Sequence, residues 1–271
     1  MFKTHPPTLW SFLATAGVIT ASLFMTSKTE AVDCAAVKAQ YQCPVEKHRL
    51  HLSFDDGVGS ATDKVLDVLK RENIKATFFV MGNKIECGRY PEGESLRLCK
   101  KRVATLERIK REGHDIGSHS YNHQRHTTIP FKLAEWNITK SKKLLEPYFT
   151  TQPPIFRLPN GDGWFNQKDK PHVMNFLKEQ GFEHIGWEMT AYDWNEKFQV
   201  GDKILDNVMG QMCGNGKPGR DGVVLFHDGV HENEHEGRMF TANNLERWIP
   251  KIRCAADFKT LSHFKKNLSK R

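Results

Sequence analysis

The sequence predicts an α/β fold, with a closed barrel of parallel strands as the leading architecture. Short apolar runs alternate with amphipathic stretches, and the alternation repeats many times over 271 residues, the length of one large domain or two small ones. Strand–helix alternation favours a mainly parallel sheet, because parallel strands need crossover connections. So many repeats within one domain length favour closure into a barrel.

The expected elements follow from apolar runs for strands and apolar faces for helices. At 62–73, for example, Val65, Leu66 and Leu69 lie on one helical face, and Gly113 gives the helix over 96–112 a typical C-terminal cap. The expected strands are 51–54, 76–81, 115–118, 155–158, 184–189 and 223–226. The expected helices are 62–73, 96–112, 133–145, 171–180, 202–212 and 243–252.

Residues 1–31 have the layout of a secretory signal. Lys3 and His5 precede an apolar stretch over 9–24, and polar and small residues follow. This stretch of 16 residues is shorter than the ~20 that a membrane-spanning helix needs, so an uncleaved anchor is the less favoured alternative. We expect an exported protein, periplasmic or extracellular, without stable membrane insertion after cleavage. An N-terminal extension over 32–48 and one domain over 49–271 would follow.

The formal net charge is +8, and the isoelectric point is near 9.1. The basic residues are scattered along helices rather than gathered in a stripe with aromatic residues between them, so a nucleic-acid partner is not expected. A basic protein would also be attracted to an anionic polymer such as a cell wall.

All six cysteines lie beyond the expected signal. An even number in an exported protein indicates three disulfides, and six cysteines allow 15 pairings. Proximity in the sequence favours Cys34–Cys43 and Cys87–Cys99, which leaves Cys213–Cys254. No CxxC spacing is present, so a cysteine-bound zinc is not expected.

Chemically capable side chains follow nearly every expected strand. Because the carboxyl ends of barrel strands meet at one face, these groups are expected to come together. They are Asp55-Asp56, His119 and His123, Arg157 with Pro159-Asn160-Gly161, Asp193-Trp194, and His227-Asp228.

His119 and His123 have a spacing that brings two imidazoles together. With one of the paired aspartates they form a two-histidine, one-carboxylate set that leaves positions open for water and substrate. Such a set suits a divalent metal, zinc first, with Co²⁺ or Ni²⁺ able to substitute, and serves hydrolysis of an amide or ester.

The remaining groups suit acid–base work. Asp55 is the expected general base, kept ionised by Arg157, and His227 is the expected acid, oriented by Asp193. The alternative is that Arg157 and Asp193 form an ordinary ion pair and that His227 is a buried polar residue without a catalytic role.

Five segments together resemble the NodB-homology polysaccharide deacetylases, carbohydrate esterase family four. They are Phe54-Asp55-Asp56-Gly57, His119-Ser120-x-x-His123, Arg157-Leu158-Pro159-Asn160-Gly161, Asp193-Trp194 and Leu225-Phe226-His227-Asp228. The resemblance implies Asp55 as base, Asp56 with His119 and His123 as metal ligands, and Arg157 as partner of the base. It implies an oxyanion contact from the backbone N–H of Asn160 next to Pro159. It also implies Asp193 tuning the acid His227, and Trp194 and Leu225 lining an acetyl pocket.

The resemblance implies a distorted (β/α) barrel and metal-dependent removal of N-acetyl groups from N-acetylglucosamine polymers, with peptidoglycan as the first choice. Chitin or chito-oligosaccharide deacetylation, polysaccharide O-acetyl esterase activity and a non-catalytic glycan-binding module are the alternatives. Three positions depart from the family pattern: Val58 replaces a proline, Asn160 replaces an aromatic residue, and the fourth motif lacks its leading aspartate, with Glu188 nearby.

His231-Glu232-Asn233-Glu234-His235 has the HExxH spacing of zinc metallopeptidases. That motif needs a helix with an apolar face, whereas this stretch is flanked by Gly229 and Gly237 and has no apolar face. We expect a solvated acidic loop there.

Overall fold

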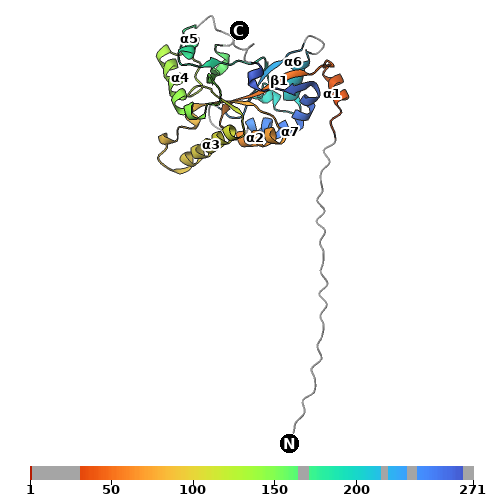
Figure 1. Ribbon diagram of the computed structural model, residues 1–271, viewed down its shortest axis with the longest axis horizontal. Helices are drawn as coiled ribbons and strands as arrows, with labels where there is room; N and C mark the ends of the chain where they lie inside the picture. The colour runs from red at the N-terminus through yellow and green to blue at the C-terminus, as the bar shows by residue number, and fades with distance from the viewer. Residues whose placement is uncertain (2–30, 164–170, 215–218, 231–236, 265–271) are drawn as a thin grey trace. The chain divides into compact units, whose positions relative to one another are not determined.

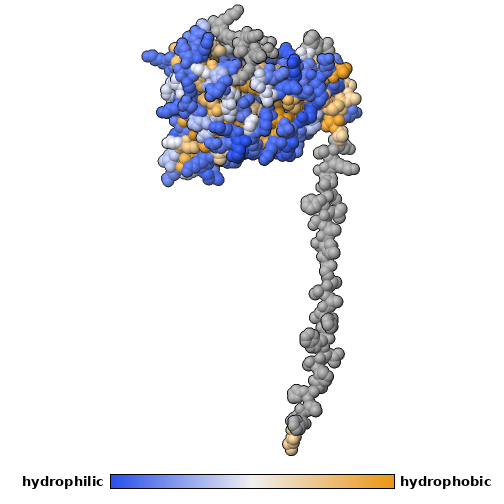
Figure 2. Space-filling model, in the orientation of Figure 1, coloured by the Kyte–Doolittle hydropathy of each residue, from blue (hydrophilic) through white to orange (hydrophobic). Residues whose placement is uncertain are grey.

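The computed structural model describes residues 1, 31–163, 171–214, 219–230 and 237–264. The expected signal, apart from its end residues, and the HExxH stretch lie outside the described residues. Val32–Arg271 forms one compact unit, and hydrophilic residues cover most of the face of this unit shown in Figure 2. Within the described segments, every helix is too short or too polar to span a lipid bilayer.

The described strands form one parallel sheet whose order follows the circumference of a barrel. The order is β5-β4-β3-β2-β1-β7-β6, and β8 pairs with the beginning of β1. The predicted distorted (β/α) barrel is confirmed, but the barrel is not closed, because β5 and β6 are the two edges and do not pair. The strands are β1 His48–Gly57, β2 Thr77–Val80, β3 Asp115–Ser118, β4 Ile155–Phe156, β5 Glu183–His184, β6 Met189–Thr190, β7 Gly222–His227 and β8 Ala256–Phe258.

The expected strand at 184–189 is wrong, since this segment crosses from one edge of the sheet to the other. β5 pairs with β4, whereas β6 pairs with β7. Between them, the carbonyl oxygens of Ile185 and Gly186 accept hydrogen bonds from the Arg157 side chain instead of from a neighbouring strand. The gap in the barrel therefore lies where a guanidinium group replaces strand pairing.

Helices cover the sheet, and Figure 1 shows α2, α3 and α7 along one side of it. The helices are α1 Cys34–Gln40, α2 Thr62–Arg71, α3 Gly93–Arg111, α4 Phe131–Leu145, α5 Pro171–Glu179, α6 Lys203–Cys213 and α7 Gly237–Ala255. Short 3-10 turns lie at 82–84, 87–89, 146–148, 159–161, 196–198 and 261–263. Helix α1, which the sequence pattern did not indicate, is capped by the Asp33 side chain, which accepts from the backbone N–H of Ala35 and of Ala36.

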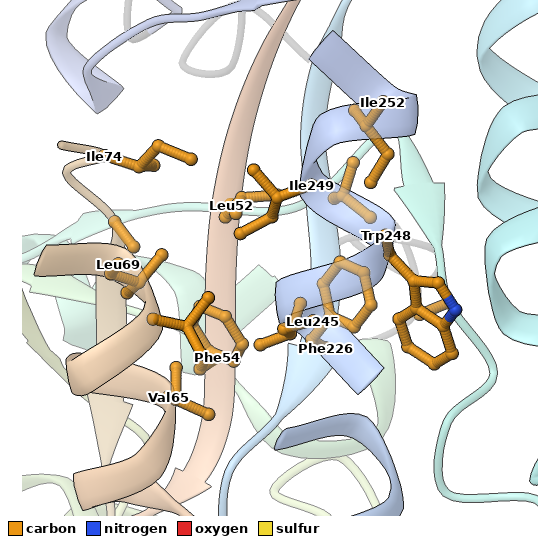
Figure 3. Packing of buried hydrophobic residues seen from close by; sticks show 14 of the residues in the cluster. Leu52, Phe54, Val65, Leu69, Ile74, Phe226, Leu245, Trp248, Ile249 and Ile252 are labelled. Atoms are coloured by element: carbon orange, nitrogen blue, oxygen red, sulfur yellow. The ribbon is translucent and has the colours of Figure 1, made fainter. Parts of the chain in front are cut away.

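The core between β1, β7, α2 and α7 fixes the strand that carries the two aspartates. Figure 3 shows its members pointing toward one another: Leu52, Phe54, Val65, Leu69, Ile74, Phe226, Leu245, Trp248, Ile249 and Ile252. Each large apolar side chain buried there contributes ~1.5–3 kcal/mol. Successive residues of a strand face opposite sides of the sheet. Phe54 therefore faces this core, while Ser53 faces the inside of the barrel, where its hydroxyl donates to the Val224 carbonyl oxygen.

All six cysteines form disulfides, as expected for staples rather than metal ligands. Cys87–Cys99 matches the expected pairing. The other two bonds are Cys34–Cys254 and Cys43–Cys213, so the predicted pairs Cys34–Cys43 and Cys213–Cys254 are wrong. Proximity in the sequence fails here because α1 packs against α7, which brings the first cysteine to the end of the last helix.

Candidate metal and acid–base site

A pocket of about 560 Å³ opens at the carboxyl ends of the strands. Most of the predicted site residues line it: Asp55, Asp56, His119, His123, Asn160, Trp194, Leu225 and His227. Arg157 and Asp193 lie behind this wall with no exposed surface. Pro159 is buried in the 3-10 turn at 159–161 and does not line the pocket, so its predicted contact with substrate is not supported.

Asp56, His119 and His123 form a cluster that fits a divalent metal. One ligand atom from each lies within 4.8 Å of the others. The Asp56 Oδ1 atom is 3.5 Å from His119 Nε2 and 3.3 Å from His123 Nε2. Two ligands held about 2.1 Å from a tetrahedral ion are about 3.4 Å apart, so the donor set has the spacing that a zinc-like ion requires.

The protonation of His119 also suits a metal ligand. Its Nδ1 lies 2.8 Å from the Arg157 carbonyl oxygen, which can only accept, so Nδ1 carries the hydrogen and Nε2 presents its lone pair to the cluster. Burial lowers the pKa of His119 to about 4. The imidazole is therefore neutral at neutral pH, and its approach to Asp56 is not a simple ion pair.

Left-handed backbone conformations orient the side chains around the proposed metal site. Asp56, Ser120 and His123 have φ angles of 67°, 68° and 60°, a region that residues other than glycine rarely occupy and that often marks functional sites. The loop after β3 is tied down at both ends: the His119 N–H donates to the Val80 carbonyl, and the His123 N–H donates to the Ser120 hydroxyl.

The main partner of Asp55 differs from those of its neighbour Asp56, although Asp55 Oδ2 also lies 3.7 Å from His119 Nε2. The Arg157 Nη1 donates to Asp55 Oδ1 at 2.7 Å and to the Ser53 hydroxyl at 2.9 Å. Burial raises the pKa of Asp55 above its ordinary value, and Arg157 acts in the opposite direction. A buried carboxylate with a raised pKa is a stronger base than an exposed one.

His227 and Asp193 form the second acid–base pair. His227 Nδ1 lies 2.8 Å from Asp193 Oδ1, and the His227 backbone N–H donates to Asp193 Oδ2 at 2.9 Å. The Thr241 hydroxyl also donates to Oδ2, at 3.1 Å. Burial disfavours the charged imidazole, but Asp193 outweighs it, and the pKa of His227 is raised. The alternative of an ion pair between Arg157 and Asp193 is therefore wrong.

The base and the acid are neighbours in the sheet. In the pairing of β1 with β7, Asp55 is the register partner of His227. The Trp194 ring lies 5.1 Å from the His227 ring in a T-shaped contact and keeps 40% of its surface exposed. An apolar wall therefore stands beside the acid.

The structure shows where the three departures from the family pattern lie. Glu188 lies outside the pocket, because its Oε2 accepts from the Val223 backbone N–H at the beginning of β7, the end remote from His227. Thr190 and Asn160 line the pocket instead, and Val58 is buried in the core.

Sequence reasoning missed several residues of the site. Tyr192, Arg125 and Arg238 line the pocket. The position of Tyr192 next to Asp193-Trp194 was a signal, whereas nothing in the sequence marked Arg238.

No role was predicted for Asp228 from the sequence, although it directly follows His227. It is buried, it accepts from the Thr62 hydroxyl at 2.5 Å, and burial raises its pKa to about 7. A Cβ atom added to Gly57 would lie 2.7 Å from both Asp228 carboxylate oxygens, so only glycine fits at that position.

An open α/β barrel with a two-histidine, one-carboxylate cluster beside two acid–base pairs is an arrangement suited to metal-assisted hydrolysis. The chain belongs to the polysaccharide deacetylase family, whose model matches residues 43–184, just over half of the chain. The predicted membership of the NodB-homology deacetylases, carbohydrate esterase family four, is thereby confirmed.

Curated relatives carry related names. A peptidoglycan-N-acetylglucosamine deacetylase of Bacillus cereus is 32% identical over 185 residues, which cover 68% of this chain and 57% of the relative. A peptidoglycan-N-acetylmuramic acid deacetylase of Bacillus subtilis is 30% identical over 179 residues, covering 65% of this chain and 32% of the relative. The chain thus spans about half or less of the length of these two relatives.

Solved structures share the fold. A peptidoglycan N-acetylglucosamine deacetylase superposes with a TM-score of 0.60 at 28% identity, covering 82% of this chain and 89% of the other. A pseudoenzyme of carbohydrate esterase family four from Bacillus anthracis superposes with a TM-score of 0.58 at 19% identity, covering 81% of this chain and 66% of the other. The second likeness shows the fold alone.

Proposed function

We propose that this protein is a metal-dependent hydrolase that removes N-acetyl groups from N-acetylglucosamine residues of an extracellular polysaccharide, with peptidoglycan as the first substrate. One observation carries the proposal: the adjacent aspartates have different partners. Asp56 Oδ1 lies near both imidazoles, while Asp55 Oδ1 accepts from Arg157 and only its Oδ2 approaches His119, at 3.7 Å. This separation provides a metal ligand and a general base side by side.

The chain's own groups suit each step of amide hydrolysis. A divalent metal bound by Asp56, His119 and His123 would make water more acidic and polarise the acetyl carbonyl. Asp55 accepts the proton of the attacking water, with Arg157 fixing its orientation. The backbone N–H of Asn160 donates to the developing oxyanion.

His227 completes the reaction by giving its Nε2 proton to the leaving amine nitrogen. Asp193 holds Nδ1 and stabilises the charged imidazole, so the acid is protonated when it is needed. Trp194 and Leu225 flank the acetyl methyl group and keep water away from it. Zinc is the favoured ion, because two imidazoles and one carboxylate are typical zinc ligands, with Co²⁺ or Ni²⁺ as substitutes.

The names of the relatives support the choice of polymer. The two Bacillus relatives are named for peptidoglycan, and the net charge of +8 suits an anionic wall. Action on a wall polymer requires export, in agreement with the signal expected over 1–31. Chito-oligosaccharide is the second candidate, because a relative from Azorhizobium caulinodans, 25% identical, is named a chitooligosaccharide deacetylase.

Acetate release from peptidoglycan and from chitin oligomers, with and without a chelator, tests the proposal. Chelator-sensitive release from peptidoglycan is expected, and Asp55→Asn should abolish it while metal and glycan still bind. Release from O-acetylated polysaccharide alone would indicate an esterase. Glycan binding by a metal-loaded protein that releases no acetate would indicate a binding module.

A further inference from the structure

Two arginines that the proposed reaction does not use, Arg125 and Arg238, line the same pocket. Arg125 follows the two histidines in the loop after β3, and Arg238 lies in the first turn of α7. The carboxylates of the described lining are Asp55 and Asp56, and both are engaged by the groups named above. Neither Arg125 nor Arg238 is paired with one of these two carboxylates, so both arginines are candidates for contact with a ligand.

Arg125 is anchored in a way that leaves its outer edge available. Its Nε lies 3.2 Å from Asp162 Oδ1, and Asp162 is fully buried and accepts the Thr127 N–H at 2.9 Å. The Arg125 side chain is 53% exposed, and its two terminal nitrogens donate to none of the described residues. Those nitrogens form a planar fork that matches the two oxygens of a carboxylate.

Arg238 supplies positive charge from a buried position. It is 6% exposed, and its Nε and Nη1 donate to the backbone carbonyls of Gly229 and Asp193. Both acceptors are neutral, and across the described part of the chain no carboxylate forms an ion pair with this guanidinium. A buried charge whose described partners are all neutral acts strongly on its surroundings, because little water screens it.

Among the described groups, the balance of charge in the pocket would be positive with a metal bound. Arg157 balances Asp55, Asp162 balances Arg125, the His227 imidazole balances Asp193, and a divalent cation would exceed the charge of Asp56. The Arg238 charge adds to this surplus. Such a pocket favours an anionic ligand over a neutral one of the same size.

We propose that Arg125, assisted by the charge of Arg238, binds a carboxylate carried by the glycan beside the N-acetyl group. The inference rests on the proposed function and deepens it: the preferred substrate is an acidic N-acetylated glycan, and Arg125 is the residue that selects it. Two carboxylate sources share this chemistry: the lactyl ether of a muramic acid-type sugar that carries no stem peptide, and the C6 carboxylate of a uronic acid. Within peptidoglycan, the site therefore selects strands whose lactyl carboxylates are free. Chitin offers neither.

The test compares kcat/KM on one glycan in two forms. The substrate is an oligomer of alternating N-acetylglucosamine and N-acetylmuramic acid with free lactyl carboxylates, and its matched form has every carboxylate converted to the methyl amide. The metal-loaded protein should prefer the free acid on the order of tenfold, with the preference shrinking as salt is added. A uronate-containing oligomer identifies which carboxylate source is accepted.

Variants assign the preference to Arg125. In Arg125→Ala the ratio of the two rates should fall close to one, and Arg125→Lys should be intermediate because it keeps the charge without the fork. Arg97→Ala is the matched control: it removes one positive charge from α3, where the side chain is 77% exposed, and should leave the ratio unchanged. An equal preference in wild type and Arg125→Ala would overturn the proposal.

A binding arm separates this inference from the proposed function. The metal-loaded Asp55→Asn protein should bind the free-acid oligomer about tenfold more tightly than the amidated one by calorimetry. If that difference holds while wild type releases no acetate, the proposed reaction fails and the carboxylate site stands. If acetate is released equally from both forms and they bind equally, the reaction stands and the carboxylate site fails.

Discussion

The backbone carbonyl of Arg157 accepts the Nδ1 hydrogen of His119, while the side chain of the same arginine holds Asp55. One residue thus sets the tautomer of a proposed metal ligand and the position of the proposed base. Its guanidinium also binds Ser53 and the carbonyls of Ile185 and Gly186, and stacks 4.0 Å from the centre of the Phe79 ring. A change at Arg157 should therefore affect stability and chemistry together.

Arg157→Lys should lower the free energy of unfolding by about 1–3 kcal/mol for each buried acceptor left without a donor. Lysine keeps the charge but cannot reach four acceptors with one ammonium group. Urea unfolding measures the stability, and kcat should fall at least 100-fold. Arg97→Ala is the surface control. A stable Arg157→Lys protein with normal kcat would contradict this role.

Asp193→Asn should lower kcat and move the alkaline limb of the pH–rate profile to lower pH. Asp193 holds the pKa of His227 above its ordinary value, so its replacement leaves less protonated imidazole at neutral pH. Thr241→Val removes only the hydroxyl that donates to Asp193 and should shift the limb less. An unmoved limb in Asp193→Asn would exclude His227 as the acid.

The same pair predicts how stability depends on pH. A histidine whose folded pKa is raised stabilises the fold fully below its ordinary pKa, and this contribution is lost as pH rises through the raised value. As pH rises from the ordinary histidine pKa to the raised pKa of His227, the free energy of unfolding of wild type should therefore fall relative to that of His227→Gln. Urea unfolding of both proteins, metal-loaded, across pH 5 to 9 measures the difference. Parallel curves would show that the pair contributes nothing.

Removal of a metal ligand should abolish metal binding. His119→Ala and Asp56→Ala should contain no stoichiometric metal after dialysis, measured by elemental analysis, whereas Asp55→Asn should retain it. Metal at 100 times its Kd should stabilise wild type by about 2.7 kcal/mol, and a chelator should reverse the gain. Retention of metal by both ligand variants would place the ion elsewhere.

The long disulfides should stabilise more than the short one. Cys87–Cys99 spans 12 residues, which corresponds to about 3 kcal/mol of chain entropy. Cys34–Cys254 spans 220 residues, but Cys43–Cys213 shortens its closed loop to about 50, which corresponds to about 4 kcal/mol. Unfolding of the Cys34→Ser/Cys254→Ser and Cys87→Ser/Cys99→Ser proteins measures the order. The reverse order would show that native contacts outweigh loop length.

Much of the fold and site followed from local patterns. Apolar runs located β1, β2, β3 and β7, and polar residues at the carboxyl ends of β1, β3 and β7 line the pocket. The failures concern relations between distant segments. No local pattern tells that Cys34 meets Cys254, or that the run at 184–189 divides between two edges, because packing of α1 on α7 and the contacts of Arg157 decide both. For the same reason, Arg238 could not be predicted as a pocket residue from the sequence.

The register of β1 with β7 places Asp55 opposite His227, although 172 positions separate them in the sequence. During synthesis, His227 is made 172 positions after Asp55. A nascent chain that ends before residue 227 therefore carries only one member of the pair. The proposed base and acid can act together only after β7 has been made and has paired with β1.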